Sequence, residues 1–339
     1  MKRAVNKGVW AMALAVMMGC GNASTGGNEN PDGGNVSTLP PRIYATVISH
    51  NEEDSNPNCK NGLNNDPSKY ATNRALLKRL AEGIVGRGAT YDQQNEWLYL
   101  SRVADAAYET SALKAQTNNQ NILAYLAALD PVRISIDVHH HNSGFLSENH
   151  ADVAGRLEQL GVSERAAWSA ASCLRRARWP KSRPCRAMPK MGSSRRRSGA
   201  AARRPGFPRS CGGGSANHVS DSPASGVWRP KNNTAFYTDD PTSILPNVGH
   251  YQGNLDFTGM ADLVAKQRAG MLSQGQMYTV TLMVNQCEMT DASVTAVLAE
   301  IDKYKDAVTA GSVVWKTLPD IVSEWKTVYG AQPQLYNAQ

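Results

Sequence analysis

The chain has 339 residues, 41% of them hydrophobic, and a formal net charge of +7, so it is long enough for one large α/β domain or two small ones. A positive charge favours an anionic partner such as nucleic acid. However, residues 165–211 hold 12 Arg, two Lys and no Asp or Glu, so 22 of the 36 basic residues remain elsewhere, against 29 acidic ones. Outside that segment the chain is acidic, which argues against a nucleic-acid-binding protein.

The first 20 residues have the pattern of an export signal. A basic head precedes an apolar run over 9–18 that is too short to span a bilayer. The run ends at Cys20 in a sequence that resembles the lipobox of bacterial lipoproteins, in which the cysteine carries lipid. We therefore expect an exported protein, lipid-anchored in the cell envelope through Cys20 or secreted if Cys20 is not lipidated. Residues 21–40, rich in Gly, Asn and Ser, are expected to form a flexible linker.

From residue 41 the sequence alternates between strand and helix patterns. Runs of β-branched residues bounded by turn formers predict strands, and apolar residues at spacings of three and four predict helices. The predicted strands are 41–49, 133–142, 277–284 and a short one that begins at 313–315, and the predicted helices are 66–86, 95–108, 121–129, 149–160, 292–308 and 318–329. Strand followed by helix, repeated, is typical of a parallel sheet or barrel, so we predict one α/β domain over residues 41–335.

Residues 165–211 interrupt this domain. They carry arginine clusters among Ala, Ser, Pro and Gly, three of the six cysteines, and neither a helix nor a strand period. A basic arm for nucleic acid or membrane and a disordered insertion are two interpretations. We favour a third, a segment translated out of frame between two compensating frameshifts in GC-rich DNA, because such DNA yields these residue types in a wrong phase. The gene read in all three phases tests this interpretation.

Two clusters of histidine and carboxylate follow predicted strands. His50 and Glu52 end the first strand, and Asp137, His139 and His141 end the second. Side chains two residues apart on a strand share a face, and the carboxyl ends of parallel strands are where ligands gather. Because imidazole and carboxylate bind divalent ions, we predict a metal site formed by His50, Glu52, His139 and His141. The alternative is a solvated acidic loop with histidines that cap strands.

A strand that ends in His-x-Glu (50–52), followed far downstream by Ile-Asp-x-His-x-His (136–141), resembles the glycoside hydrolase/polysaccharide deacetylase superfamily. The resemblance implies an irregular, TIM-like β/α barrel of about seven strands with a divalent ion, typically zinc, at the strand ends. Glu52 stands where the α-mannosidase branch has Asp, and the histidines are spaced differently from the His-x-x-x-His of the deacetylase branch. Segments similar to motifs of uncharacterised bacterial secreted lipoproteins of this barrel type are 48–53, 149–154 and 225–230.

The resemblance implies a metal-dependent hydrolase acting on carbohydrate, deacetylase-like or glycosidase-like. Zinc lowers the pKa of bound water to about 7, and the resulting hydroxide would attack an acetamide or ester carbonyl with Asp137 or Glu53 as base. In a glycosidase these carboxylates would be nucleophile and acid, and Asp137 equally suits the role of orienting an imidazole. Trp228, Arg229 and His250 are candidate substrate contacts, with packing in the core as the alternative for Trp228.

A second hypothesis, from a different class, is a non-catalytic cell-surface lipoprotein that binds glycan or metal. In both hypotheses the expected partner is carbohydrate or another cell-envelope polymer, and the membrane is contacted through the lipid anchor. The cysteines add one expectation. Cys59 and Cys287 remain once Cys20 is assigned to lipid and three others lie in 165–211. Since an exported protein can keep a disulfide, we expect these two to pair.

Overall fold

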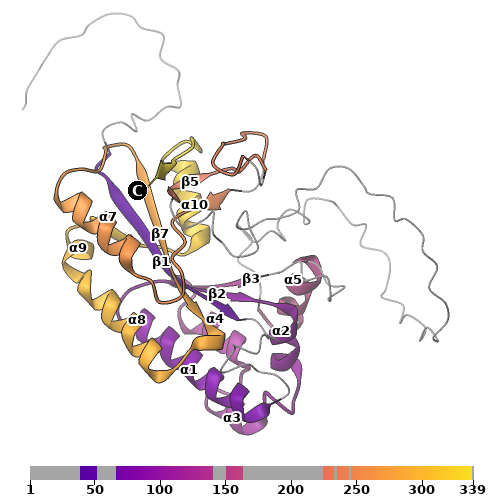
Figure 1. Ribbon diagram of the computed structural model, residues 1–339. Coiled ribbons are helices and arrows are strands. Elements are labelled where there is room, and N and C mark those ends of the chain that lie inside the picture. The colour runs from indigo at the N-terminus through magenta and orange to yellow at the C-terminus, as the bar shows by residue number, and fades with distance from the viewer. Residues whose placement is uncertain are drawn as a thin grey trace, which may run out of the picture. The chain divides into compact units, whose positions relative to one another are not determined.

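The computed structural model describes residues 39–51, 66–139, 150–162, 224–232, 235–243 and 246–337 (Figure 1). The export signal, Cys20 and the arginine-rich segment 165–211 lie outside these residues, so their interpretation stays a prediction. Within the described residues, no helix is long and apolar enough to cross a bilayer.

The described chain alternates between strands and helices, as the sequence predicts. The first part comprises β1 (Arg42–Asn51), α1 (Pro67–Val85), β2 (Tyr91–Asn95), α2 (Trp97–Ala104), α3 (Ser111–Ala115), α4 (Ile122–Leu129), β3 (Ile134–Val138) and α5 (His150–Gln159). The second part comprises β4 (Ala224–Ser225), β5 (Val227–Trp228), β6 (Asn247–Val248), α7 (Thr258–Arg268), β7 (Met277–Asn285), the 3-10 helix η2 (Gln286–Glu288), α8 (Asp291–Lys303), α9 (Lys305–Thr309), β8 (Val313–Trp315), α10 (Leu318–Thr327) and β9 (Tyr336–Asn337).

Local sequence signals explain where these helices begin. Asp66 caps α1 by accepting hydrogen bonds from the N–H groups of Ser68 and Lys69, and proline follows it at the first helical position. Asn121 caps α4 in the same way. The segment predicted as one helix over 292–308 is instead two helices, α8 and α9, separated at Tyr304.

The central sheet is parallel, and β1 lies in its middle. The strand order is β3-β2-β1-β7, and β8 also pairs with β1. On one side β1 runs along β7 for its whole length. On the other side Ile43–Ala45 pairs with β8, whereas Val47–Asn51 pairs with β2. We call the point between these two pairings, at Thr46, the fork. The predicted mixed α/β fold with a mainly parallel sheet is confirmed, and among the described strands no pairing closes the sheet into a barrel.

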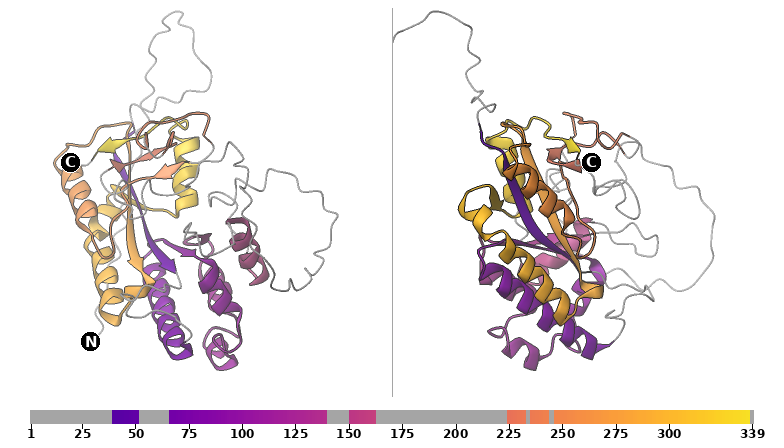
Figure 2. Two further views of the ribbon diagram at one scale, coloured as in Figure 1. Left: turned by 45° about the vertical axis from the view of Figure 1, so that its right-hand side comes forward. Right: turned by 60° about the vertical axis from the view of Figure 1, so that its left-hand side comes forward.

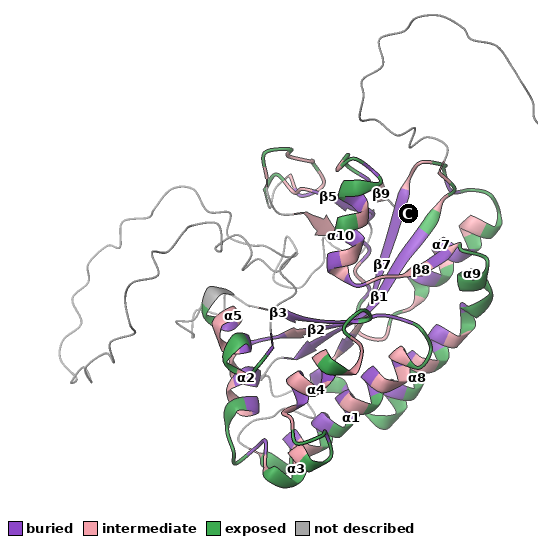
Figure 3. Ribbon diagram, turned by 180° about the vertical axis from the view of Figure 1, so that it is seen from behind, coloured by how far each residue is buried: buried purple, intermediate pink, exposed green. Residues whose placement is uncertain are grey.

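The two faces of this sheet differ in chemistry, because side chains alternate along each strand. One face, the helix face, is mostly apolar and belongs to one large core with residues of α1, α2, α4, α7 and α8. Its strand residues in that core are Ile43, Ala45, Val47, Tyr91, Ile134, Ile136, Val138, Tyr278, Val280, Leu282, Val284 and Val313. At the carboxyl end of this face the register also places four buried polar side chains, Ser49, Asn51, Gln93 and Asn95. Figures 1 and 2 show α1, α7 and α8 along this side, and Figure 3 shows buried strands beneath helices whose outer surfaces are exposed.

The opposite face, the polar face, carries hydrophilic side chains that are nonetheless mostly buried. The register of the strands places together on it Thr46, His50, Asp92, Gln94, Ser135, Asp137, Thr279 and Thr281. Near the amino ends of the strands this face is covered: Tyr44 packs in an apolar cluster with Trp325 and Tyr329 at the end containing α10. The β4–β5 segment also docks there, since Gly226 N–H donates to the Thr279 hydroxyl at 2.8 Å. The titratable groups therefore occupy the carboxyl half of the polar face.

A buried ion pair ties α1 to the chain that precedes α4. The Arg74 guanidinium donates to both carboxylate oxygens of Glu109 at 2.9–3.0 Å, and each side chain is 1% exposed. Glu109 also accepts hydrogen bonds from the Tyr70 hydroxyl and the Ile122 N–H. This network satisfies both buried charges, which otherwise would cost several kcal/mol.

Replacing Glu109 with Gln should therefore destabilise the fold by about 3 kcal/mol or more, because it leaves the Arg74 charge buried without a counter-charge. Urea-induced unfolding measures this loss. The matched control is Glu82→Gln, which removes the charge from the half-exposed pair with Lys78 and should cost less than about 1 kcal/mol. Equal losses in the two variants would contradict the role of the buried pair.

Candidate functional site

The site is built around two histidines at the carboxyl edge of the sheet. His50 is next to last in β1 and 4% exposed, and His139 directly follows β3. The His139 N–H donates to the Asn95 carbonyl at 2.9 Å, so the β-type pairing continues to this residue. The two imidazole rings lie with their centroids 4.1 Å apart and their planes at 33°. The structure thus brings together two of the four predicted metal ligands, from strands separated by β2.

A tyrosine joins this pair from a segment that has no long strand of its own. After β6, the chain runs parallel to β7: the Thr281 N–H donates to the His250 carbonyl, and the Gln252 N–H donates to the Thr281 carbonyl. Tyr251 is paired with Thr281 and so shares the polar face. Its hydroxyl lies 3.2 Å from Nε2 and 3.4 Å from Nδ1 of His50.

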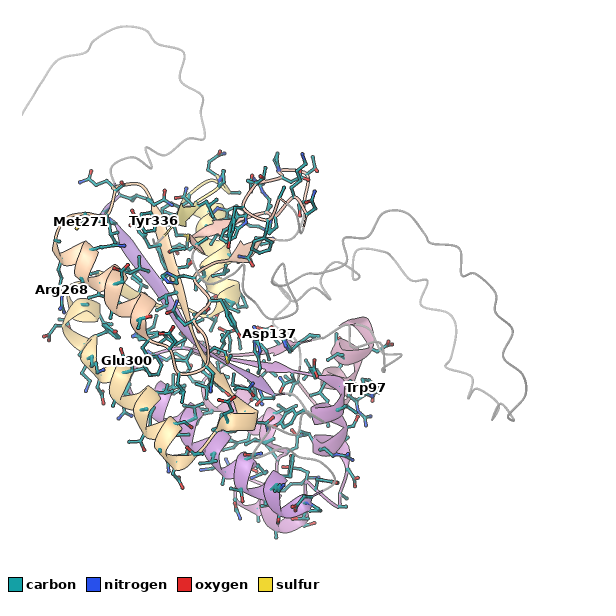
Figure 4. All side chains as sticks on the ribbon, in the orientation of Figure 1. Trp97, Asp137, Arg268, Met271, Glu300 and Tyr336 are labelled. Atoms are coloured by element: carbon teal, nitrogen blue, oxygen red, sulfur yellow. The ribbon has the colours of Figure 1, made fainter. Side chains whose placement is uncertain are left out.

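Two carboxyl groups lie deeper on the same face. Asp92 of β2 is fully buried, and its Oδ2 accepts hydrogen bonds from the Thr46 hydroxyl at 3.0 Å and the Leu318 N–H at 2.9 Å. Asp137 of β3 is 5% exposed and accepts from the Ser135 hydroxyl at 2.6 Å; Figure 4 labels Asp137. The two carboxyl groups lie close enough for the charge of Asp137 to disfavour ionisation of Asp92.

The surroundings of Asp92 favour its protonated form. Burial raises the pKa of Asp92 well above its usual value, and the nearby Asp137 raises it further. The Leu318 N–H and the Thr46 hydroxyl oppose this rise without cancelling it. Asp92 therefore keeps its proton to a higher pH than an exposed aspartic acid does.

His250, a predicted substrate contact, lies on the other side of the sheet from His50. It is 5% exposed and its imidazole lies against Gly259 in the first turn of α7, where a Cβ atom would collide with it. Burial lowers the pKa of His250, which keeps the ring neutral. Its backbone has φ +58°, a left-handed conformation that is uncommon for histidine. The structure therefore assigns His250 an anchoring position, and its neighbour Tyr251 faces the site.

The other two predicted substrate contacts are engaged in packing. Trp228 is fully buried, packs edge-on against Phe236, and donates its indole N–H to the Phe236 carbonyl at 2.7 Å. Trp228 is therefore packed in the core, which was the alternative to its role as a substrate contact. Arg229 forms a two-pronged ion pair with Asp239 at 2.7 and 3.1 Å, and its guanidinium lies over the Trp325 ring. Neither arrangement presents a tryptophan face on which a sugar can stack.

The remaining predicted site residues are Glu52, Glu53, His141 and Cys59, which lie outside the described residues. The backbone of Cys287 forms part of η2, at the carboxyl end of β7. In the described part of the chain, no group of three or more His, Cys, Asp or Glu side chains is placed to hold a metal ion. His50 and His139 could form part of a ligand set for one divalent ion, but their rings face each other and would have to turn for both to direct a nitrogen at a common centre.

Sequence reasoning missed two residues of this site, Asp92 and Tyr251. Asp92 lies in β2, whose sequence Tyr-Asp-Gln-Gln-Asn has no apolar alternation and so gave no strand signal. Tyr251 stands next to the predicted contact His250 but has no sequence signal of its own. Its facing depends on pairing with Thr281, which a local pattern does not encode.

Comparisons with protein-family models, with curated proteins and with solved structures find no match to this chain.

The raised pKa of Asp92 makes the stability of the fold depend on pH. The contribution of Asp92 to stability is fully present below the pKa that it has in the unfolded chain, near 4, and is lost as the pH rises through its pKa in the folded protein. Asn at position 92 escapes this loss, because its Oδ1 accepts from Thr46 and Leu318 while its amide donates to Asp137. Asp92→Asn should thus match wild type near pH 3 and exceed it at pH 7 by on the order of 1 kcal/mol.

Denaturant unfolding at several pH values measures this difference. A variant that is less stable than wild type by the same amount at pH 3 and pH 7 would show that Asp92 ionises normally in the folded protein.

Proposed function

We propose that this protein is a metal-dependent hydrolase acting on carbohydrate, deacetylase-like or glycosidase-like, exported and held at the cell envelope by a lipid at Cys20. The observation that carries the proposal is the contact of the His50 and His139 rings at the carboxyl edge of a parallel sheet. Catalytic groups of α/β barrels and open α/β sheets gather at this edge. A buried carboxyl pair on the same face of the sheet as the two imidazoles adds the proton-handling groups that hydrolysis needs.

We extend the proposal to the architecture, an irregular β/α barrel of the glycoside hydrolase/deacetylase superfamily. One observation supports it. Most helices cover one face of the sheet, α10 covers only the amino end of the other, and the polar residues of that second face correspond to a barrel interior.

The proposed ion is zinc, held by His50 and His139 with Glu52 and His141. A divalent ion there would supply Lewis-acid activation of water and of a substrate carbonyl. The chain contributes imidazoles from two strands: β2 and β7 pair with β1 on both sides of His50, and the His139 N–H bonds to the Asn95 carbonyl of β2. Such fixed ligands hold an ion without the entropy cost of ordering loops.

The carboxyl pair supplies acid–base chemistry in this proposal. Asp92 is the member with the raised pKa, and Asp137 is the member nearer the histidines in sequence and the less buried of the two. Asp137 can then accept a proton from water or return it to a leaving group, with Glu53 as the second candidate base. The large apolar core on the helix face offsets the cost of burying polar groups on the opposite face.

Metal binding and hydrolysis together test the function. Wild-type protein should bind about one zinc ion and release acetate from acetylated chitooligosaccharides or aryl acetates. His139→Ala and His50→Ala should each weaken zinc binding at least 10-fold and lower acetate release at least 100-fold, because each removes a ligand. Glu82→Gln, which removes a charge from the partly exposed pair with Lys78 on α1, should leave zinc binding unchanged.

Two outcomes separate the alternatives. Zinc binding that disappears in both alanine variants, with no hydrolysis of any acetylated or glycosidic substrate by wild type, would support a non-catalytic glycan- or metal-binding lipoprotein instead. Undiminished zinc content in both variants would remove the proposed site.

A further inference from the structure

Gln94 lies on the polar face between two residues of the candidate site. It belongs to β2, and its register partners on the neighbouring strands are His50 of β1 and Asp137 of β3. Neighbouring strands are about 4.8 Å apart, and residues paired in register point to the same face of a sheet. His50, Gln94 and Asp137 therefore form one row across the carboxyl edge.

This row is accessible at Gln94. The other four residues of β2 are buried, whereas Gln94 is only partly buried. Asp92, two residues earlier on the same face, is fully buried, and the flanking His50 and Asp137 are 4% and 5% exposed. The polar face thus opens to solvent at the level of Gln94, and a ligand that enters the row from solvent contacts this side chain.

The imidazole rings of the site lie over the same strand. His50 and His139 come from β1 and from the end of β3, which β2 separates by about 10 Å, yet their ring centroids are 4.1 Å apart. Both side chains must therefore lean toward β2, which carries Gln94. A ligand that contacts Gln94 consequently lies beside the two histidines.

The side-chain amide of Gln94 has hydrogen-bonding capacity that the fold does not use. Its backbone carbonyl accepts from the Asn51 Nδ2 at 3.0 Å, but its amide forms no hydrogen bond within the described part of the chain. The nearby amides of Asn51, Gln93 and Asn95 all donate hydrogen bonds inside the sheet. An amide offers two donors and one acceptor on an uncharged group, which matches the uncharged neighbouring substituents of a sugar ring.

We propose that Gln94 is a substrate-binding residue, whose side-chain amide hydrogen-bonds as donor and as acceptor to two neighbouring uncharged substituents of a carbohydrate. The class of ligand rests on the proposed function. The contact itself involves only described residues and needs no metal ion. Gln94 takes the role that the sequence assigned to Trp228 and Arg229, whose side chains are engaged in packing.

Calorimetric titration of the full chain with the N-acetylglucosamine trimer tests the proposal. The buffer contains a chelator, so that no metal-dependent turnover takes place. Gln94→Leu keeps the approximate size of the side chain but removes its donors and its acceptor. It should weaken binding about 10-fold or more, because the hydrogen bonds to the sugar are lost. Gln94→Glu keeps an acceptor but has no donor, and it should weaken binding as well.

Two further measurements separate binding from a structural role. Urea-induced unfolding of Gln94→Leu should have the same midpoint as that of wild type, because the amide has no hydrogen-bond partner among the described residues. The matched control is Gln267→Leu. Gln267 is a partly buried glutamine of α7, which packs on the helix face, so its replacement should leave trimer binding unchanged.

Equal affinity of Gln94→Leu and wild type for the trimer would overturn the proposal, and so would a lower unfolding midpoint of this variant. Wild-type affinity in Gln94→Glu would contradict the donor role, and a wild-type protein that does not bind the trimer would remove the contact. These outcomes leave the proposed hydrolase to its own test of zinc binding and acetate release. Conversely, trimer binding that depends on Gln94 in a protein without zinc binding or hydrolysis would remove the hydrolase and keep the contact.

Discussion

The architecture depends on the fork at Thr46, where β1 exchanges β8 for β2 as its neighbour. Two strands cannot both hydrogen-bond to the same stretch of one edge of β1, so β8 and β2 part at Thr46. Asp92 links the elements that meet there: its Oδ2 accepts from the Thr46 hydroxyl and from the Leu318 N–H that begins α10. The carboxyl group that joins β1, β2 and α10 is also the one whose pKa burial and the nearby Asp137 raise.

The two roles of Asp92, in joining the strands and in the carboxyl pair, explain why a buried face of the sheet is polar. A structural site needs only a satisfied acceptor at position 92, which Asn would provide at lower cost in stability. A raised pKa at Asp92, on the same face as a second carboxyl group and two imidazoles, agrees with the proposed proton-exchanging site. The large apolar core on the helix face and the fully satisfied Arg74–Glu109 pair supply the stability that such a face reduces.

The sequence predicts the order of the long elements and the meeting of His50 with His139, because both depend on local alternation and on the rule that parallel strands gather their ends at one edge. It does not predict β2, whose residues are polar at every position after Tyr91. It also does not predict Tyr251, whose facing is set by pairing with Thr281 far along the chain. Pairing between distant segments determines where β2 and Tyr251 lie. Periodicity within a short window of sequence carries no information about such pairing. For the same reason, His250 was expected beside the site and lies on the opposite face.

The central claim is that His50 and His139 share one divalent ion. X-ray absorption at the zinc edge of the loaded protein tests it most directly, because imidazole rings give a characteristic pattern of outer-shell carbon scattering. The account predicts at least two imidazole ligands with Zn–N distances of about 2.0–2.1 Å, and the loss of one imidazole in His139→Ala. A zinc shell made only of oxygen scatterers, or a spectrum unchanged by that substitution, would contradict it.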